Sequence, residues 1–161
     1  MKKLTFLLVV ITLLTLTSCK SDTIIPKGYY DSDVWTTSSV NTYANFINFI
    51  KYYYDEDMIE SLDKNKFLEK MDNTSLEELE TLLSLFETEV NEYNYDEENT
   101  LKENYNLKFD QVSKDDYIYI DYRVNNQYNP DVDKSIYDYF MIYYFDVSEN
   151  TLYYCSLQYT V

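Results

Sequence analysis

The sequence contains no histidine, one glycine and two cysteines. Histidine is the commonest general base and the usual partner of a catalytic serine or cysteine, so these enzyme classes are excluded. Zinc sites built from histidine and cysteine are excluded for the same reason. The single glycine, Gly28, cannot supply a phosphate-binding loop of the P-loop or dinucleotide type. These absences predict a non-enzymatic protein with no cofactor and no metal.

The chain also lacks an apolar run long enough to cross a membrane. Its first uncharged stretch, Leu4–Leu16, follows two lysines and has 13 residues, whereas a spanning helix needs about 20. This pattern is typical of a secretory signal. The segment Leu16-Thr17-Ser18-Cys19 directly behind it resembles the lipobox of bacterial lipoproteins. The resemblance implies cleavage before Cys19 and lipid on its thiol, and so an exported protein anchored in a membrane of the bacterial cell envelope.

Basic residues are scarce in the remaining chain. Residues 1–18 hold two lysines and no acidic residue, so the formal charge of −16 becomes −18 over the 143 residues that follow. Such a charge repels phosphate backbones, so we expect no nucleic-acid partner. It also repels anionic lipid, which makes the lipid on Cys19 the expected link to the membrane. Acidic chains are often disordered, but 18% of residues are aromatic, including 20 tyrosines, which is enough for a core.

The small number of cysteines bears on stability. With Cys19 lipidated, Cys155 has no partner in the chain, so no disulfide framework forms. Cys155 lies in an apolar, aromatic segment, which favours a buried small hydrophobe over a reactive thiol.

The mature chain is expected to form a tether and one domain. Residues 19–40 are polar and without periodicity, which indicates a tether, with Trp35 near its end docking on the domain. Residues 41–161 form a single domain that begins with helices over about 41–54, 55–71 and 76–93. The third pattern is the clearest, and Ser75 with Glu78 fits a capping box at its start. Its apolar positions are Leu76, Leu79, Leu83, Phe86, Val90 and Tyr93.

The apolar period changes from helical to two after Asn106. Alternation over about 107–112, 117–124, 136–146 and 152–161 predicts four strands rich in tyrosine, isoleucine and valine. The short links predict antiparallel neighbours. Residues 148–150 are expected to form the last turn, with Asn150 in a left-handed conformation.

This order predicts an α+β fold, with about three N-terminal helices packed on a four-stranded antiparallel curved sheet. The order resembles the nuclear transport factor two-like, or cystatin-like, roll over about residues 41–161. The resemblance rests on the topology, the helical pattern from Tyr43 to Ile50, the strand ending at Val124 and the final hairpin.

The remaining chemistry is that of carboxylates and phenols. Residues 131–135 begin like a calcium loop, but Ile136 and Ile142 stand where the loop needs glycine and glutamate, so a plain turn is preferred. The roll resemblance also admits an enzyme in which Asp121 is a base and a tyrosine stabilises an oxyanion, which needs an apolar pocket.

The tyrosine-rich strands favour binding instead. If helices cover one sheet face, tyrosines line the other, where they offer area and hydrogen bonds at little entropic cost. We expect a binding or accessory lipoprotein whose partner is a protein, peptide or glycan. An alternative is an immunity or exclusion lipoprotein that neutralises a basic toxin or an incoming factor. The residues expected on the aromatic binding face are Tyr117, Tyr119, Tyr137, Tyr139 and Tyr143.

Overall fold

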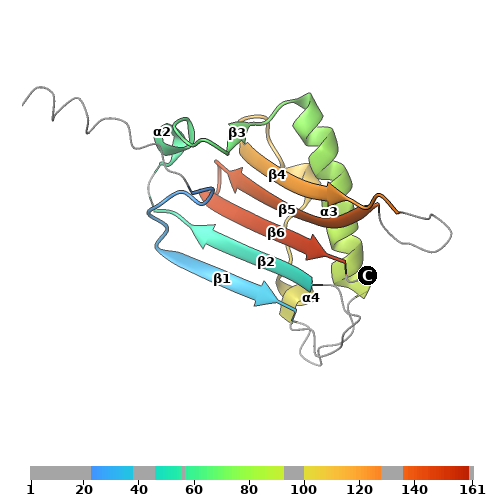
Figure 1. Cartoon of the computed structure of the whole chain (residues 1–161). Coiled ribbons are helices and arrows are strands. Elements are labelled where there is room, and N and C mark those ends of the chain that lie inside the picture. The colour runs from blue at the N-terminus through green and yellow to red at the C-terminus, as the bar shows by residue number, and fades with distance from the viewer. Residues whose placement is uncertain (1–22, 38–45, 56, 93–99, 128–135, 160–161) are drawn as a thin grey trace, which may run out of the picture.

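The computed structural model describes residues 23–37, 46–55, 57–92, 100–127 and 136–159. The fold is α+β, with one long helix and short helices on a six-stranded antiparallel open sheet (Figure 1). The strands lie in the order β1-β2-β6-β5-β4-β3. Their bounds are β1 Asp31–Thr36, β2 Phe46–Tyr53, β3 Glu69–Lys70, β4 Tyr117–Val124, β5 Tyr137–Asp146 and β6 Thr151–Gln158.

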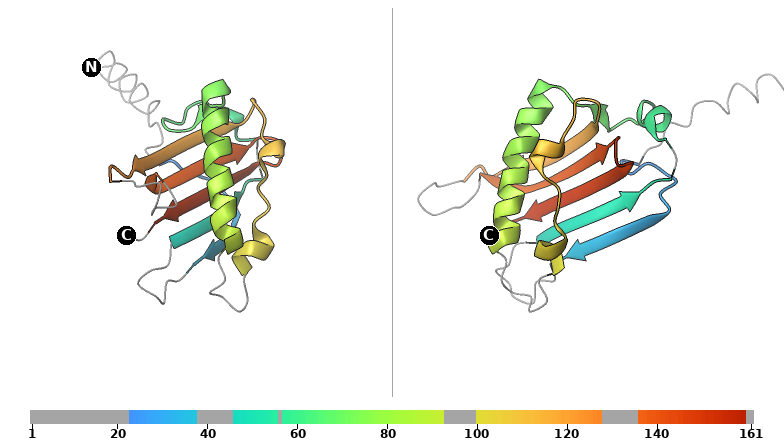
Figure 2. Two further views of the ribbon diagram at one scale, coloured as in Figure 1. Left: turned by 90° about the vertical axis from the view of Figure 1, so that its right-hand side faces the viewer. Right: turned by 180° about the vertical axis from the view of Figure 1, so that it is seen from behind.

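The long helix α3 (Asn73–Glu92) confirms the third helical pattern. With α4 (Thr100–Asn104) it lies on one face of the sheet, as the view from behind in Figure 2 shows. Its buried stripe contains the expected Leu79, Leu83, Phe86 and Val90, and also Leu82. This stripe packs on the sheet residues Ile47, Phe49, Ile118, Phe140, Ile142, Cys155 and Leu157 to form the main core.

The helix begins three residues earlier than the sequence pattern indicates. Asp72, not Ser75, is the N-cap: its Oδ1 accepts from the Ser75 main-chain N–H at 2.8 Å, and the Ser75 Oγ accepts from the Asp72 N–H at 2.8 Å. This is a reciprocal capping box with serine in the third position.

The helix expected over residues 41–54 is wrong, because strand β2 occupies Phe46–Tyr53. Apolar residues at 46, 47, 49 and 50 satisfy both periods in so short a run. Isoleucine and aromatic residues suit a strand, and pairing with β6 places Ile47 and Phe49 in the core.

The helix expected over 55–71 is also wrong. It is reduced to α2 (Ile59–Leu62), followed by the short strand β3. The Asn65 side chain accepts from the main-chain N–H groups of Phe67 and Leu68, at 2.8 and 3.1 Å. These bonds satisfy the N–H groups that a continuous helix would have used, and so they turn the chain.

Two further expectations fail at the level of single elements. The strand expected over 107–112 is a turn of 3₁₀ helix at Phe109–Gln111, which brings Phe109 and Val112 against the core. Part of the expected tether is strand β1, whose Trp35 stacks on Phe49 with ring centroids 5.5 Å apart. Trp35 therefore docks on the sheet as expected, through a strand rather than a tether.

The last three strands agree with the sequence patterns. Strands β4, β5 and β6 form an antiparallel meander. Asn150 takes the expected left-handed conformation, with φ of 52°. Its Nδ2 donates to the Tyr54 main-chain oxygen at 2.7 Å, so the last turn is tied to the end of β2.

Candidate functional site

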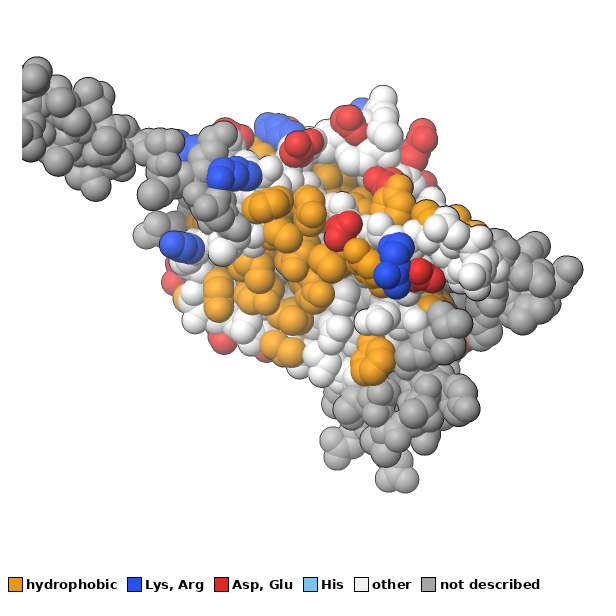
Figure 3. All heavy atoms as spheres, viewed as in Figure 1, with side chains coloured by type: hydrophobic (Ala, Val, Ile, Leu, Met, Phe, Trp, Pro, Cys, Tyr) orange, Lys and Arg blue, Asp and Glu red, His pale blue; other side chains and the backbone are white. Residues whose placement is uncertain are grey.

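The candidate site is the sheet face opposite helix α3. Near β3 this face is covered by a second cluster of buried side chains, which we call the α2 cluster. The rest of the face carries no helix among the described elements, and Figure 3 shows apolar side chains gathered over it. The α2 cluster consists of Tyr54, Met58, Leu62, Leu68, Tyr117, Phe145 and Leu152.

Four tyrosines, one from each of the strands β4, β5, β6 and β2, lie on this open face and are partly exposed. We call Tyr119, Tyr143, Tyr154 and Tyr52 the tyrosine row. Tyr143 stands directly opposite Tyr119 on β4 and Tyr154 on β6. The corresponding ring centroids are 6.2 and 4.7 Å apart, which is the contact range of paired aromatic rings. Strand register therefore aligns these three rings. Tyr52 lies two residues further along β2, because Tyr154 pairs with Ile50 and Tyr52 pairs with Leu152.

Aromatic rings extend the row at both ends. The Phe67 ring meets Tyr119 edge to face at 5.7 Å, and the Tyr29 ring meets Tyr52 in the same manner at 5.0 Å. Val34, on β1, is 56% exposed on the same face. The result is a continuous apolar and aromatic surface across the sheet.

Polar groups border this surface at the end of the sheet away from α2. The Asn48 Nδ2 donates to the Ser156 Oγ at 2.9 Å. The Arg123 guanidinium lies over the Tyr139 ring, 5.5 Å from its centroid, and pairs with Asp138 at 2.8 Å. An apolar centre with a polar border is the usual composition of a protein interaction surface.

Burial changes the pKa of two phenols in the row. Burial, together with the neighbouring phenols of Tyr154, Tyr52 and Tyr119, raises the pKa of Tyr143 to about 12. Burial also raises the pKa of Tyr52. Tyr143 and Tyr52 therefore offer neutral hydroxyl groups that both donate and accept hydrogen bonds.

Three of the five residues expected on the aromatic face lie on the open part of it, namely Tyr119, Tyr139 and Tyr143. Tyr117 points to the same side but is buried in the α2 cluster, where its hydroxyl donates to Asp63. Tyr137 packs on Phe140 against the helix side, because a bulge shifts the register between β4 and β5 at that point.

Sequence reasoning missed Tyr52 and Tyr154. Tyr52 lay in a segment expected to be helical, so its sheet face could not be assigned. Tyr154 carried a usable signal, since it alternates with the buried Tyr153 and Cys155 of β6.

Asp121, the base in the enzyme hypothesis, is partly exposed on the open face, and the Tyr139 hydroxyl lies 3.4 Å from its carboxylate. That hypothesis requires an enclosed apolar pocket around the carboxyl group. Across the part of the chain that the structure describes, no three acidic or cysteine side chains gather in a metal-binding geometry. Cys19 and the loop at residues 131–135 lie outside the described residues.

Cys155 is fully buried in the core, as expected, and its burial raises the pKa of the thiol. Since the thiolate is the reactive form, we expect no labelling of Cys155 by a maleimide at pH 7 in the folded protein. A Cys19→Ala chain, which leaves Cys155 as the single thiol, should react fully in 8 M urea. Rapid labelling without urea would contradict the buried placement.

Alkaline pH is expected to unfold the protein. Burial and the Asp63 carboxylate raise the pKa of Tyr117 to about 12, and Tyr143 has a similar value. The unfolded phenols lose their protons near pH 10, so between pH 10 and 12 the unfolded state binds fewer protons. Stability is therefore complete below pH 10 and falls as the pH rises to 12. Urea midpoints measured from pH 8 to 12 test this, and a constant midpoint would contradict it.

Comparison of the chain with known protein families, with curated proteins and with solved structures found no match. None of the helices in the described ranges has the length and hydropathy needed to span a membrane.

Proposed function

We propose that this protein is an exported, membrane-anchored lipoprotein that binds a partner through the tyrosine row and catalyses no reaction. Lipid on Cys19 is the anchor. The observation that carries the binding function is the continuity of the row over four adjacent strands on a sheet face without a helix. A folded protein normally buries such a surface, so an aromatic face of this extent is characteristic of an interaction site.

The partner is a protein, peptide or glycan. Tyrosine rings offer large contact areas that lose little conformational freedom on binding. The row contains no carboxylate or ammonium group, so it does not itself require a charged ligand. The immunity or exclusion hypothesis is the same function with a basic toxin as partner, and the charge of −18 over residues 19–161 favours association with such a molecule.

We also propose that the fold is related to the cystatin-like roll. In support, helix α3 packs across the antiparallel meander β4-β5-β6. Of the four strands that the sequence patterns predicted, β4, β5 and β6 are present, and β1, β2 and β3 complete the six-stranded sheet.

Site-specific photo-crosslinking in intact cells tests the binding function. A photoreactive amino acid at Tyr139, beside the row, should give a defined adduct, whereas the same group at Glu80, exposed on helix α3, should not. Adding Tyr143→Ser and Tyr154→Ser should remove the adduct, because a few central aromatic anchors carry most of the binding energy. Equal adducts from both positions, or an adduct that survives the serine variants, would reject the tyrosine row as the site.

Fractionation tests the anchor. The Cys19→Ala chain should lose metabolic labelling by palmitate and move from the membrane to the soluble fraction, since lipid chains supply the membrane affinity. Ser18→Ala, which keeps a small residue before the cysteine, is the matched control and should remain labelled. Lipid label on the Cys19→Ala chain would disprove the proposed anchor.

A further inference from the structure

Strand β4 has an edge that the rest of the described chain leaves mostly uncovered. Its outer neighbour β3 has two residues, which pair with Ile118 and Tyr117. Beyond Ile118 no described segment pairs with this side of β4, and Figure 1 shows β3 as a short element at one end of the longer strand.

The directions of the main-chain groups follow from one hydrogen bond. The Met71 N–H donates to the Asp116 oxygen at 3.0 Å, so the main-chain groups of Asp116 point toward β3 and away from β5. These directions alternate along a strand. The N–H and C=O groups of Ile120 and Tyr122 therefore point outward from the uncovered edge. An edge of this kind is a template for another strand.

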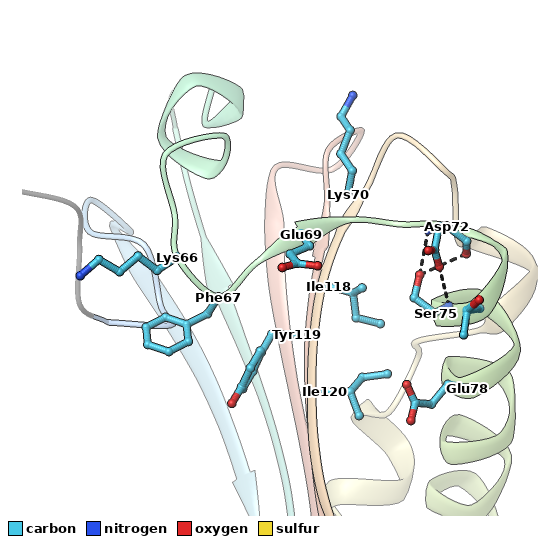
Figure 4. A pocket seen from close by; sticks show the side chains of 11 residues that line it. Lys66, Phe67, Glu69, Lys70, Asp72, Ser75, Glu78, Ile118, Tyr119 and Ile120 are labelled. Atoms are coloured by element: carbon cyan, nitrogen blue, oxygen red, sulfur yellow. Dashed lines mark hydrogen bonds between the residues drawn. The ribbon is translucent and has the colours of Figure 1, made fainter.

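A hollow of about 390 Å³ lies along this edge. It is bordered by β4, by residues 66–70 and by the start of helix α3. In Figure 4 the carboxylates of Glu69 and Glu78 point into it from opposite sides. The ammonium groups of Lys66 and Lys70 point away from it in the same view. The hollow is therefore negative, although both signs of charge surround it.

The two sides of the hollow differ in chemistry. Ile118, Ile120 and Glu78 line the side toward helix α3. Phe67 and Tyr119 line the side that continues into the open face, with their rings in contact. The side chains of a strand added here would alternate between the two sides. On one side they would meet the Glu78 carboxylate and the two isoleucines, and on the other the two aromatic rings.

We propose that the β4 edge from Tyr119 to Tyr122 binds an extended, basic segment of a partner protein as an added β-strand. The main chain of the segment pairs with Ile120 and Tyr122. Lysine or arginine side chains opposite these residues reach Glu78, and the alternate apolar side chains pack on Phe67 and Tyr119. This site goes beyond the proposed function, because it lies at the sheet edge and does not require the tyrosine row.

A second copy of this chain is a poorer occupant of the edge. Each copy carries a formal charge of −16 or below, so two copies repel each other. Pairing two β4 edges would also bring Glu69 and Glu78 of both copies into one interface. The charge of the hollow thus selects a basic segment.

The probe is a nine-residue peptide that alternates lysine with valine, titrated against the full chain by fluorescence anisotropy. Directly opposed residues of paired strands share a sheet face. Lysines opposite Ile120 and Tyr122 therefore have their own N–H groups directed at β4, while the valine N–H groups point away. N-methylation of the lysine amides should weaken binding about tenfold per lost hydrogen bond. N-methylation of the valine amides should leave it within about threefold.

Variants of the protein give an independent test. Proline is tolerated in an edge strand where its missing N–H would face solvent, so Tyr122→Pro should fold yet bind the peptide about tenfold more weakly than Tyr122→Ala. Glu78→Gln should weaken binding about threefold, whereas Glu80→Gln, exposed on the same helix, should not. Bound peptide should also slow hydrogen exchange at Ile120 and Tyr122.

Several results would overturn the proposal. These are no binding at 1 mM peptide, equal affinities for the two methylated peptides, and equal binding of a peptide with glutamate in place of lysine. Loss of binding in Tyr143→Ser without loss in Tyr122→Pro would assign the peptide to the tyrosine row instead. Concentration-dependent protection of Ile120 and Tyr122 in the protein alone would assign the edge to a second copy.

Discussion

Asp116→Ala is expected to lower the free energy of unfolding by about 4 kcal/mol, since each buried donor left unpaired costs about 1–3 kcal/mol. The Asp116 carboxylate is 2% exposed and accepts three hydrogen bonds. The donors are the Tyr144 hydroxyl at 2.7 Å, the Ser113 N–H at 2.7 Å and the Val147 N–H at 3.0 Å. Alanine removes the acceptor for all of them and fills none of the space.

Urea unfolding followed by circular dichroism measures this loss. Asp115→Ala is the matched control, because Asp115 is the neighbouring carboxylate and is exposed. Its change should stay within about 0.5 kcal/mol. A loss below 1 kcal/mol in Asp116→Ala would mean that water or another side chain replaces the carboxylate.

Phe86→Ala is expected to have an effect of the same size, about 4 kcal/mol, because it removes a buried ring and leaves a cavity. Phe86 has no exposed surface and lies at the centre of the helix stripe. Its ring is 5.3 Å from that of Tyr105, which in turn contacts Phe49 at 5.1 Å. The ring therefore joins helix α3 to the sheet through the segment that follows α4.

The same urea titration tests this variant against Ser84→Ala, an exposed position two residues earlier on the same helix. Ser84→Ala should change the free energy by less than about 0.5 kcal/mol. If Phe86→Ala also stays within this range, the helix is not packed on the sheet as described.

Sequence patterns predicted the elements whose own residues decide their structure. Helix α3 repeats its apolar stripe from Leu76 to Val90, and strands β4, β5 and β6 alternate over eight residues or more. In both cases the pattern is long enough to distinguish a helical period from the two-residue period of a strand. Asn150 likewise lies in a four-residue turn whose chemistry is local.

The predictions fail where contacts between segments distant in the sequence determine the structure. The segment Phe46–Tyr53 becomes a strand because β6 is available as its partner, which no local pattern reveals. Strand β1 has little alternation of its own, and it is held by pairing with β2 and by Trp35 on Phe49. The sheet face on which the Tyr137 side chain lies depends on a bulge of one residue, because a one-residue shift moves a side chain to the opposite face of the sheet.

The aromatic character of the candidate site could be predicted from the sequence, but not all of the residues that form it. The number of tyrosines in the strands indicated an aromatic face, and Tyr119, Tyr139 and Tyr143 were found from alternation. The row also needs Tyr52 from the first half of the chain. Its cross-strand neighbours follow from strand order and register, which a single sequence does not contain.

The attachment of residues 23–26 to the end of the sheet would limit how far the domain can lie from a membrane if Cys19 carries the proposed lipid. The Tyr54 hydroxyl donates to the Pro26 oxygen at 2.9 Å, and the Asn65 amide lies 3.3 Å from the Ile24 oxygen. With lipid on Cys19, three residues separate the anchor from Thr23, and these four steps along the chain reach at most about 14 Å. The α2 end of the domain is then held close to the bilayer. The domain therefore meets molecules that arrive at the membrane surface rather than molecules further out in the envelope.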